Sequence, residues 1–193
     1  MYKEDSGIDF GTWSDPVSRL IYFDAMPYLL SIVDTNKSAA DLGGANGILK
    51  KFFSDIITVD IDGSKKPDVI CDILNYKGVH NTLVLRYVMH YLTDTQVVAL
   101  MENISLFHKG EVLVIQFVNE ENSIDIKNAN SKNEGKKFFR TESELKKLIK
   151  FGLLREKRIS YECDSEFYLN RLGIKNAQTH SETILSLIYK VAQ

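Results

Sequence analysis

Short runs of β-branched and aliphatic residues alternate with segments of helical periodicity along most of this 193-residue chain. Alternation of strand and helix favours a mostly parallel sheet that is covered by helices. A chain of this length can bury a sizeable core within one domain. We therefore predict a single α/β domain, with strands over residues 39–42, 56–61, 68–71, 83–87 and 112–118.

Capping boxes mark the beginnings of two helices. Thr93 is followed three residues later by Gln96, and Thr141 is followed in the same way by Glu144. In this motif each side chain bonds the backbone N–H of the other residue. A further helix is expected over residues 15–33, where a proline stands in the first turn.

Two more extended runs close the chain, over residues 153–163 and 183–191. No helical pattern of 10–15 residues separates them, so a standard parallel crossover cannot join them. We expect the final strand to be antiparallel.

Composition and charge exclude several classes of protein. The 24 basic and 26 acidic residues give a net charge of −2, which argues against wholesale affinity for nucleic acid. Cys71 and Cys163 form neither a disulfide framework nor a CxxC zinc motif, and no HExxH motif is present. The sequence also shows no signal-peptide core and no apolar run long enough to span a membrane. We expect a cytoplasmic protein without a metal.

A glycine-rich turn follows the first predicted strand, in the sequence Asp41-Leu42-Gly43-Gly44-Ala45-Asn46-Gly47. The dinucleotide fingerprint G-x-G-x-x-G fails because position 45 is alanine, and the phosphate-loop motif fails because no Gly-Lys-Ser/Thr follows. An acid precedes the turn and no basic residue follows until Lys50, which favours a ligand with a cationic or amino-bearing part. A tight turn without a ligand is the alternative.

Further acids follow the second and third predicted strands. Asp60 stands 19 residues after Asp41, close to the spacing of about 20 residues typical of a ribose-binding carboxylate. Asp72 ends the next strand. Each acid alone suits a helix cap or a solvated charge, but acids at the ends of three successive strands favour one site.

These features resemble class I methyltransferases that use S-adenosylmethionine. Asp41, Gly43 and Gly47 match the family motif D-x-G-x-G-x-G, and Ala45 replaces its middle glycine. The resemblance implies a Rossmann-like sheet of seven strands, mostly parallel with an antiparallel last strand and with helices on both faces. Residues 38–193 would form this cofactor-binding scaffold, and S-adenosylhomocysteine would be the product.

The resemblance also implies roles for individual residues. Asp60 would hold the ribose hydroxyls while Ile61 packs on the adenine, and Asp72 would accept from the adenine amino group beside Ile73. Backbone carbonyls after the fourth strand would lie near the amino group of the cofactor. The full set of implied cofactor contacts is Asp41, Gly43, Gly44, Gly47, Asp60, Ile61, Asp72, Ile73, Arg86 and Tyr87.

The segment that follows the fourth strand resembles a stretch of small-molecule O-methyltransferases, L-R-x-V-L-H-D-W-x-D. There the histidine is the general base, which implies that role for His90. Tyr91 and Leu92 stand where the family has Asp-Trp. A histidine can accelerate transfer to a hydroxyl by about 10²–10⁴-fold. The alternative is that His90 packs in the turn and bonds to backbone.

Two segments outside the scaffold are candidates for binding the methyl acceptor. Residues 1–37 are expected to form a helical flap, with Trp13, Arg19 and Tyr22 near the substrate. The alternative is a helix that only packs on the sheet.

The second candidate is the long polar segment of residues 119–140, interpreted as a lid loop. It lies partly within residues 127–158, where 11 basic and 4 acidic residues give a local charge of +7. Lys136, Lys137 and Arg140 would attract an anionic acceptor. A solvated helix face explains the other lysines.

The sequence thus predicts an enzyme that moves a methyl group from S-adenosylmethionine to a small molecule, at a hydroxyl or carboxyl oxygen. Two alternatives stay open. One is an RNA or protein methyltransferase, which only the basic stretch favours. The other is a module that binds S-adenosylmethionine without catalysis.

Overall fold

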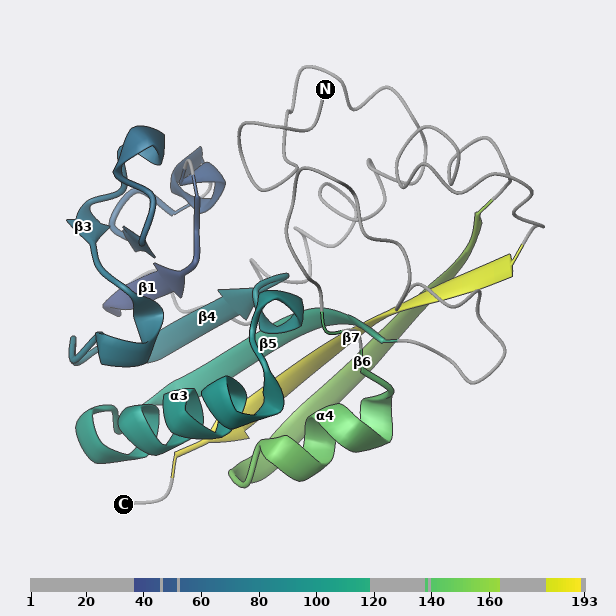
Figure 1. The fold of residues 1–193 in the computed structure, drawn as a ribbon. Helices are drawn as coiled ribbons and strands as arrows, with labels where there is room; N and C mark the ends of the chain where they lie inside the picture. The colour runs from purple at the N-terminus through teal and green to yellow at the C-terminus, as the bar shows by residue number, and fades with distance from the viewer. Residues whose placement is uncertain are drawn as a thin grey trace.

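One sheet of seven strands organises the protein (Figure 1). The structure is a computed structural model, and it describes residues 37–45, 47–51, 53–118, 138, 140–163 and 180–191. The strands are β1 (Ala39–Leu42), β2 (Ile57–Asp60), β3 (Val69–Ile70), β4 (Thr82–Arg86), β5 (Glu111–Val118), β6 (Gly152–Cys163) and β7 (His180–Lys190).

The strand order is β3-β2-β1-β4-β5-β7-β6. Strands β1 to β5 pair in parallel, whereas β7 is antiparallel to both β5 and β6. The predicted sheet of seven strands with an antiparallel last strand is therefore confirmed. The bounds of β1 match the expected ones, and those of the other strands differ by at most three residues.

Both predicted capping boxes are present. Helix α3 (Asp94–Phe107) follows Thr93, whose hydroxyl accepts from the Gln96 amide at 3.2 Å while the Gln96 side chain accepts from the Thr93 amide at 2.9 Å. Thr141 and Glu144 repeat this arrangement at the start of α4 (Glu142–Leu148). The two helices lie on the same face of the sheet (Figure 1). The helix expected over residues 15–33 lies outside the described residues.

Four 3₁₀ helices complete the described elements: η3 (Ile48–Lys51), η4 (Gly63–Lys65), η5 (Ile73–Asn75) and η6 (Met89–Tyr91). After the glycine turn, the structure shows the short η3. A full crossover between parallel strands takes about a dozen residues or more. The connection between Leu42 of β1 and Ile57 of β2 reaches this length, and η3 is the helical element described within it.

The core lies between the central strands and α3. All four residues of β1 and all five residues of β4 are buried, because each strand is paired on both sides. The apolar face of α3 packs against them through Val97, Leu100, Met101 and Ile104, which repeat at helical spacing. Within the described residues, no helix combines the length and the apolar character that crossing a membrane requires.

Gly110 is a close-packed position at the start of β5. A Cβ atom there would lie 1.9 Å from the carbonyl oxygen of Asn81, which belongs to rigid backbone, whereas a Cβ at Gly152 would meet nothing closer than 3.8 Å. Gly110→Ala should lower the free energy of unfolding by about 1–3 kcal/mol, as overpacking typically does. Gly152→Ala is the matched control. Chemical denaturation of both variants measures the difference, and equal stabilities would contradict the packing.

Candidate functional site

A cavity of about 400 Å³ opens at the carboxyl ends of the parallel strands. The strand order reverses between β1 and β4, and α/β sheets bind ligands in the crevice at such a switch point. The volume falls within the range of small-molecule sites. The described residues that line it are Gly43, Ala45, Asp60, Ile61, Asp62, Asp72, Ile73, Leu74, Arg86, Tyr87, Val88, Tyr91, Leu92 and Gln96.

The glycine turn after β1 forms one wall of this cavity. Gly43, Ala45 and Gly47 all have positive φ angles, of 73°, 46° and 70°. A glycine adopts this conformation without strain, whereas an alanine does so at some cost. At Gly43 a Cβ would also come within 2.6 Å of the Val88 side chain. The turn therefore needs glycine at Gly43 for two reasons.

Asp60, at the end of β2, fixes the turn in place. Its Oδ2 accepts a hydrogen bond from the Ala45 amide at 2.9 Å, and its Oδ1 accepts from the Asp62 amide at 2.9 Å. A carboxylate oxygen has two lone pairs, so each oxygen can accept one bond more. Asp60 can thus hold the turn and still accept hydroxyl hydrogens of a ligand in the cavity.

Two further acids lie along the same edge. Oδ1 of Asp62 accepts from the Ser64 amide at 2.9 Å. Hydrogen bonds from Ser64 lower the pKa of the Asp62 carboxyl. Asp72 caps η5 with one oxygen, which accepts from the Leu74 amide at 3.0 Å. The structure therefore brings Asp60, Asp62 and Asp72 together in one cavity wall. Their negative charge favours a ligand that carries positive charge or amino hydrogens.

Asp41 lies beneath the turn and not in the cavity lining. Its side chain is 1% exposed, and neither carboxyl oxygen has a hydrogen-bond partner among the described residues. Burial raises the pKa of this carboxyl to about 6; Arg86 opposes the rise, and Asp60 adds to it. A Cβ at Gly44 would come within 2.7 Å of Asp41 Oδ2, so only glycine lets the turn lie on this carboxyl group.

The end of β4 supplies the opposite wall. Arg86 is buried at 6% exposure and its guanidinium lies 5.8 Å from the centre of the Tyr87 ring. Tyr87 was expected within the strand but leaves it with a φ of 55°, a strained value for a tyrosine. Its amide is held by the Ile115 carbonyl at 2.8 Å. Non-glycine residues in this conformation cluster at ligand sites.

His90 lies in η6, directly behind the cavity wall. It is 7% exposed, and it does not belong to the described lining. The Gln116 side-chain amide bonds its Nδ1 at 2.9 Å, and the ring packs on Tyr91 with centroids 4.2 Å apart.

The structure places the other predicted site residues in different surroundings. The cavity brings together Gly43, Asp60, Ile61, Asp72, Ile73, Arg86 and Tyr87, while Asp41, Gly44 and Gly47 lie beneath or beside its turn. Arg140 is buried against backbone carbonyls of the segment after β4. Trp13, Arg19, Tyr22, Lys136 and Lys137 lie outside the described residues, as do residues 1–36 of the expected flap of residues 1–37 and most of the lid loop.

The sequence did not identify several lining residues, notably Leu74, Val88 and Gln96. All follow a strand or begin a helix at the carboxyl edge of the sheet, so the rule that ligands bind at that edge could have indicated them. Among the residues that the structure describes, no three His, Cys, Asp or Glu side chains group closely enough to hold a metal ion.

The buried Asp41 carboxyl predicts a particular dependence of stability on pH. Its pKa in the folded protein is about 6, against an ordinary value of 3.8. As the pH rises between these values, the unfolded chain loses this proton first, so stability falls. Asp41→Asn removes the effect. Relative to this variant, the wild-type protein should lose on the order of 2 kcal/mol of unfolding free energy from about pH 4 to about pH 7.

Chemical denaturation at each pH measures this difference. Asp55→Asn, at an exposed position before β2, is the control and should follow the wild-type protein. A difference between wild type and Asp41→Asn that stays constant with pH would contradict the prediction.

No family model and no curated protein matches this chain. Solved structures do match it. A protein of Bacillus halodurans C-125, provisionally assigned as a methyltransferase, has 10% identity, a TM-score of 0.69, and coverage of 88% of this chain and 98% of its own. The N-methyltransferase NodS from Bradyrhizobium japonicum WM9, in complex with S-adenosylhomocysteine, has 14% identity, a TM-score of 0.63, and coverage of 98% and 95%.

Magnesium protoporphyrin IX methyltransferase from Synechocystis PCC 6803, with S-adenosylhomocysteine bound, has 11% identity, a TM-score of 0.58, and coverage of 90% and 87%. At these identities the likeness concerns the fold. The fold expected from the sequence is confirmed: this chain has the Rossmann-like fold of class I S-adenosylmethionine-dependent methyltransferases.

Proposed function

We propose that this protein is an enzyme that transfers the methyl group of S-adenosylmethionine to an oxygen atom of a small molecule. The observation that carries the proposal is the cavity at the switch point, with a left-handed glycine turn on one side and three acids along its edge. Neighbours of the same fold bind S-adenosylhomocysteine in their solved structures, which supports the cofactor.

The lining residues fit the parts of such a cofactor. Asp60 retains acceptor capacity for the two ribose hydroxyls, and the exposed Ile61 offers an apolar surface for adenine. Asp72 has one oxygen beyond its helix cap, suited to an amino hydrogen. The acidic character of the wall favours a sulfonium cation over a pyrophosphate.

The buried Asp41 supports the assignment of the amino-acid end. A carboxyl group without a partner among the described residues is costly in the interior, because it loses its hydrogen bonds to water. An ammonium group bound near the turn would stabilise the charged form of this carboxyl. Arg86, in the facing wall, would balance the carboxylate of the same ligand.

S-Adenosylmethionine supplies an electrophilic methyl group, which the acceptor oxygen takes up by direct displacement as the carbon–sulfur bond breaks. The protein contributes mainly alignment, which can supply a large share of the rate. An acceptor hydroxyl also loses a proton, and we assign His90 as the base that takes it. His90 follows β4 and stands next to Tyr91, which lines the cavity.

Gln116 suits this role of His90. Its amide bonds Nδ1 of the imidazole from the neighbouring strand β5. An amide can present either its N–H or its oxygen, so Gln116 can bond either neutral tautomer of the ring. When the amide oxygen accepts from Nδ1–H, the Nε2 atom carries the lone pair that a base requires.

The comparisons and the charge of the chain bear on the nature of the acceptor. NodS is an N-methyltransferase, and the Synechocystis neighbour is a magnesium protoporphyrin IX methyltransferase, so the fold accommodates different acceptors. The basic stretch of residues 127–158 supports an anionic acceptor. It supports RNA less, because Lys146 is engaged by Glu142 and Glu156.

Loss of the Asp60 charge should weaken the cofactor site. Asp60→Asn keeps one acceptor oxygen but removes the second one and the negative charge. The affinity for S-adenosylhomocysteine should fall by about 10-fold or more, as expected for charged hydrogen bonds. Titration calorimetry measures this change, with Asp55→Asn as the exposed control. Unchanged affinity in Asp60→Asn would remove the cofactor assignment.

The role of His90 can be separated from binding. His90→Gln should reduce turnover by about 10²–10⁴-fold while the affinity for S-adenosylhomocysteine changes little. Release of S-adenosylhomocysteine in the presence of a panel of phenols and carboxylic acids measures turnover. His80→Gln is the control, because His80 precedes β4 and so lies at the opposite end of that strand from His90. Equal turnover in both variants would exclude His90 as the base, and a wild-type protein that binds but never turns over would favour a non-catalytic module.

A further inference from the structure

Arg140 is a buried cation just before α4. Its side chain is 6% exposed, although it stands at the end of the polar segment that the sequence assigned to acceptor binding. A charge in the interior is costly unless it is paired and hydrogen-bonded. The contacts of Arg140 therefore show what the residue does.

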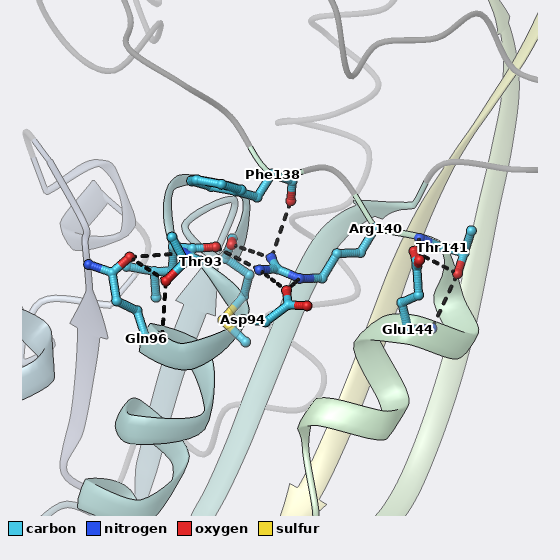
Figure 2. A network of polar contacts seen from close by, with 9 residues as sticks. Thr93, Asp94, Gln96, Phe138, Arg140, Thr141 and Glu144 are labelled. Carbon is cyan, nitrogen blue, oxygen red and sulfur yellow. Dashed lines mark hydrogen bonds and ion pairs between the residues drawn. The ribbon is translucent and has the colours of Figure 1, made fainter.

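All three nitrogens of its guanidinium group are engaged by the protein (Figure 2). Nε donates to Oδ1 of Asp94 at 2.8 Å, and Nη2 lies 2.7 Å from the same oxygen. Nη1 donates to the carbonyls of Met89 at 2.8 Å and Phe138 at 3.2 Å. Nη2 donates to the carbonyl of Leu92 at 2.6 Å.

Two of these partners, the carbonyls of Met89 and Leu92, belong to one short stretch, residues 88–92, which we call the 88–92 turn. The backbone of Phe138 adds a further bond, since its amide donates to the His90 carbonyl at 2.7 Å. Phe138 and Arg140 thus donate hydrogen bonds to the carbonyls of residues 89, 90 and 92. The donors and acceptors are more than 40 positions apart in the sequence.

The 88–92 turn forms part of the cavity wall. Val88, Tyr91 and Leu92 line the cavity, and His90 lies within the turn. The turn therefore connects Arg140 to both the proposed cofactor site and the proposed base.

The turn has little intrinsic support for its shape. It contains a single 3₁₀ segment, with bonds from Tyr91 to Val88 at 3.0 Å and from Leu92 to Met89 at 3.3 Å. Val88 occupies the N-cap position without a side-chain bond, and Tyr87 before it has a left-handed backbone. Short 3₁₀ segments of this kind are weakly stable by themselves.

Only arginine can make this set of contacts. Its planar group directs donors toward the Asp94 carboxylate on one side and toward three separate carbonyls on the other. A lysine has one nitrogen with three donors and cannot reproduce this fork.

We propose that Arg140 is a positioning residue: it holds the 88–92 turn in the shape that the cofactor cavity and His90 require. The inference rests on the proposed function for the identity of the ligand. It gives Arg140 a different task from the acceptor binding expected from the sequence.

The test compares two substitutions at Arg140 with a matched control. Arg140→Gln and Arg140→Lys should each weaken binding of S-adenosylhomocysteine by about 10-fold or more, because small displacements of a binding wall are costly. Lys146→Gln breaks the ion pairs of Lys146 with Glu142 and Glu156 but leaves the 88–92 turn intact. The affinity of this variant for S-adenosylhomocysteine should therefore stay within about 2-fold of wild type. Titration calorimetry gives these affinities.

Hydrogen exchange provides a readout that a purely structural role would not produce. The Tyr91 and Leu92 amides should exchange faster in both Arg140 variants, whereas amides of β4 such as Leu85 should keep their protection. If the Arg140 variants show wild-type affinity and unchanged exchange in the turn, the proposal is overturned, whatever happens to the melting temperature.

These experiments distinguish a wrong cofactor from a wrong role of Arg140. If the wild-type protein fails to bind S-adenosylhomocysteine, the proposed cofactor is wrong, and the exchange measurement still decides whether Arg140 holds the turn. If Arg140→Gln does not fold, Asp94→Ala replaces it, since Asp94 is 74% exposed and its loss removes one anchor of the guanidinium. Wild-type affinity and exchange in Asp94→Ala and Arg140→Lys would then overturn the proposal.

Discussion

The hydrogen bond from the Ala45 amide to the Asp60 carboxylate is the contact on which the cavity depends. It joins the turn after β1 to the end of β2, two elements that meet only because parallel strands place their carboxyl ends at one edge. The amides of Gly43 and Gly44 reinforce the junction by donating to the Val59 carbonyl. Left-handed backbone is tolerated in the turn because these bonds determine its shape.

Two buried charges serve different purposes in this structure. Arg140 is engaged through all three guanidinium nitrogens, so its charge stabilises a fixed arrangement of the 88–92 turn. Asp41 has no hydrogen-bond partner among the described residues, and burial shifts its pKa to about 6. A buried charge whose hydrogen bonds are all made stabilises the backbone around it. A buried group without hydrogen bonds destabilises the fold, and a bound ligand can offset that destabilisation.

Much of the fold and the cofactor edge could be predicted from local patterns. The capping boxes at Thr93 and Thr141 need only residues three apart, and the glycine turn with Asp60 and Asp72 needs only the spacing of successive strands. After Gly47 the described residues form only the short η3. The departure of Tyr87 from its strand has no local signal, since the Ile115 carbonyl of a neighbouring strand holds it.

The sequence by itself determined the succession of strands along the chain, the antiparallel last strand and the acids at one edge, because side-chain periodicity and motif spacing are local properties of a chain. Only the tertiary structure decided that Asp41 lies beneath the turn, that His90 lies behind the wall beside Gln116, and that Arg140 is buried. The environment of each of these groups is set by segments far away in the chain. Burial and long-range pairing, which control pKa and position, arise only when those segments pack together.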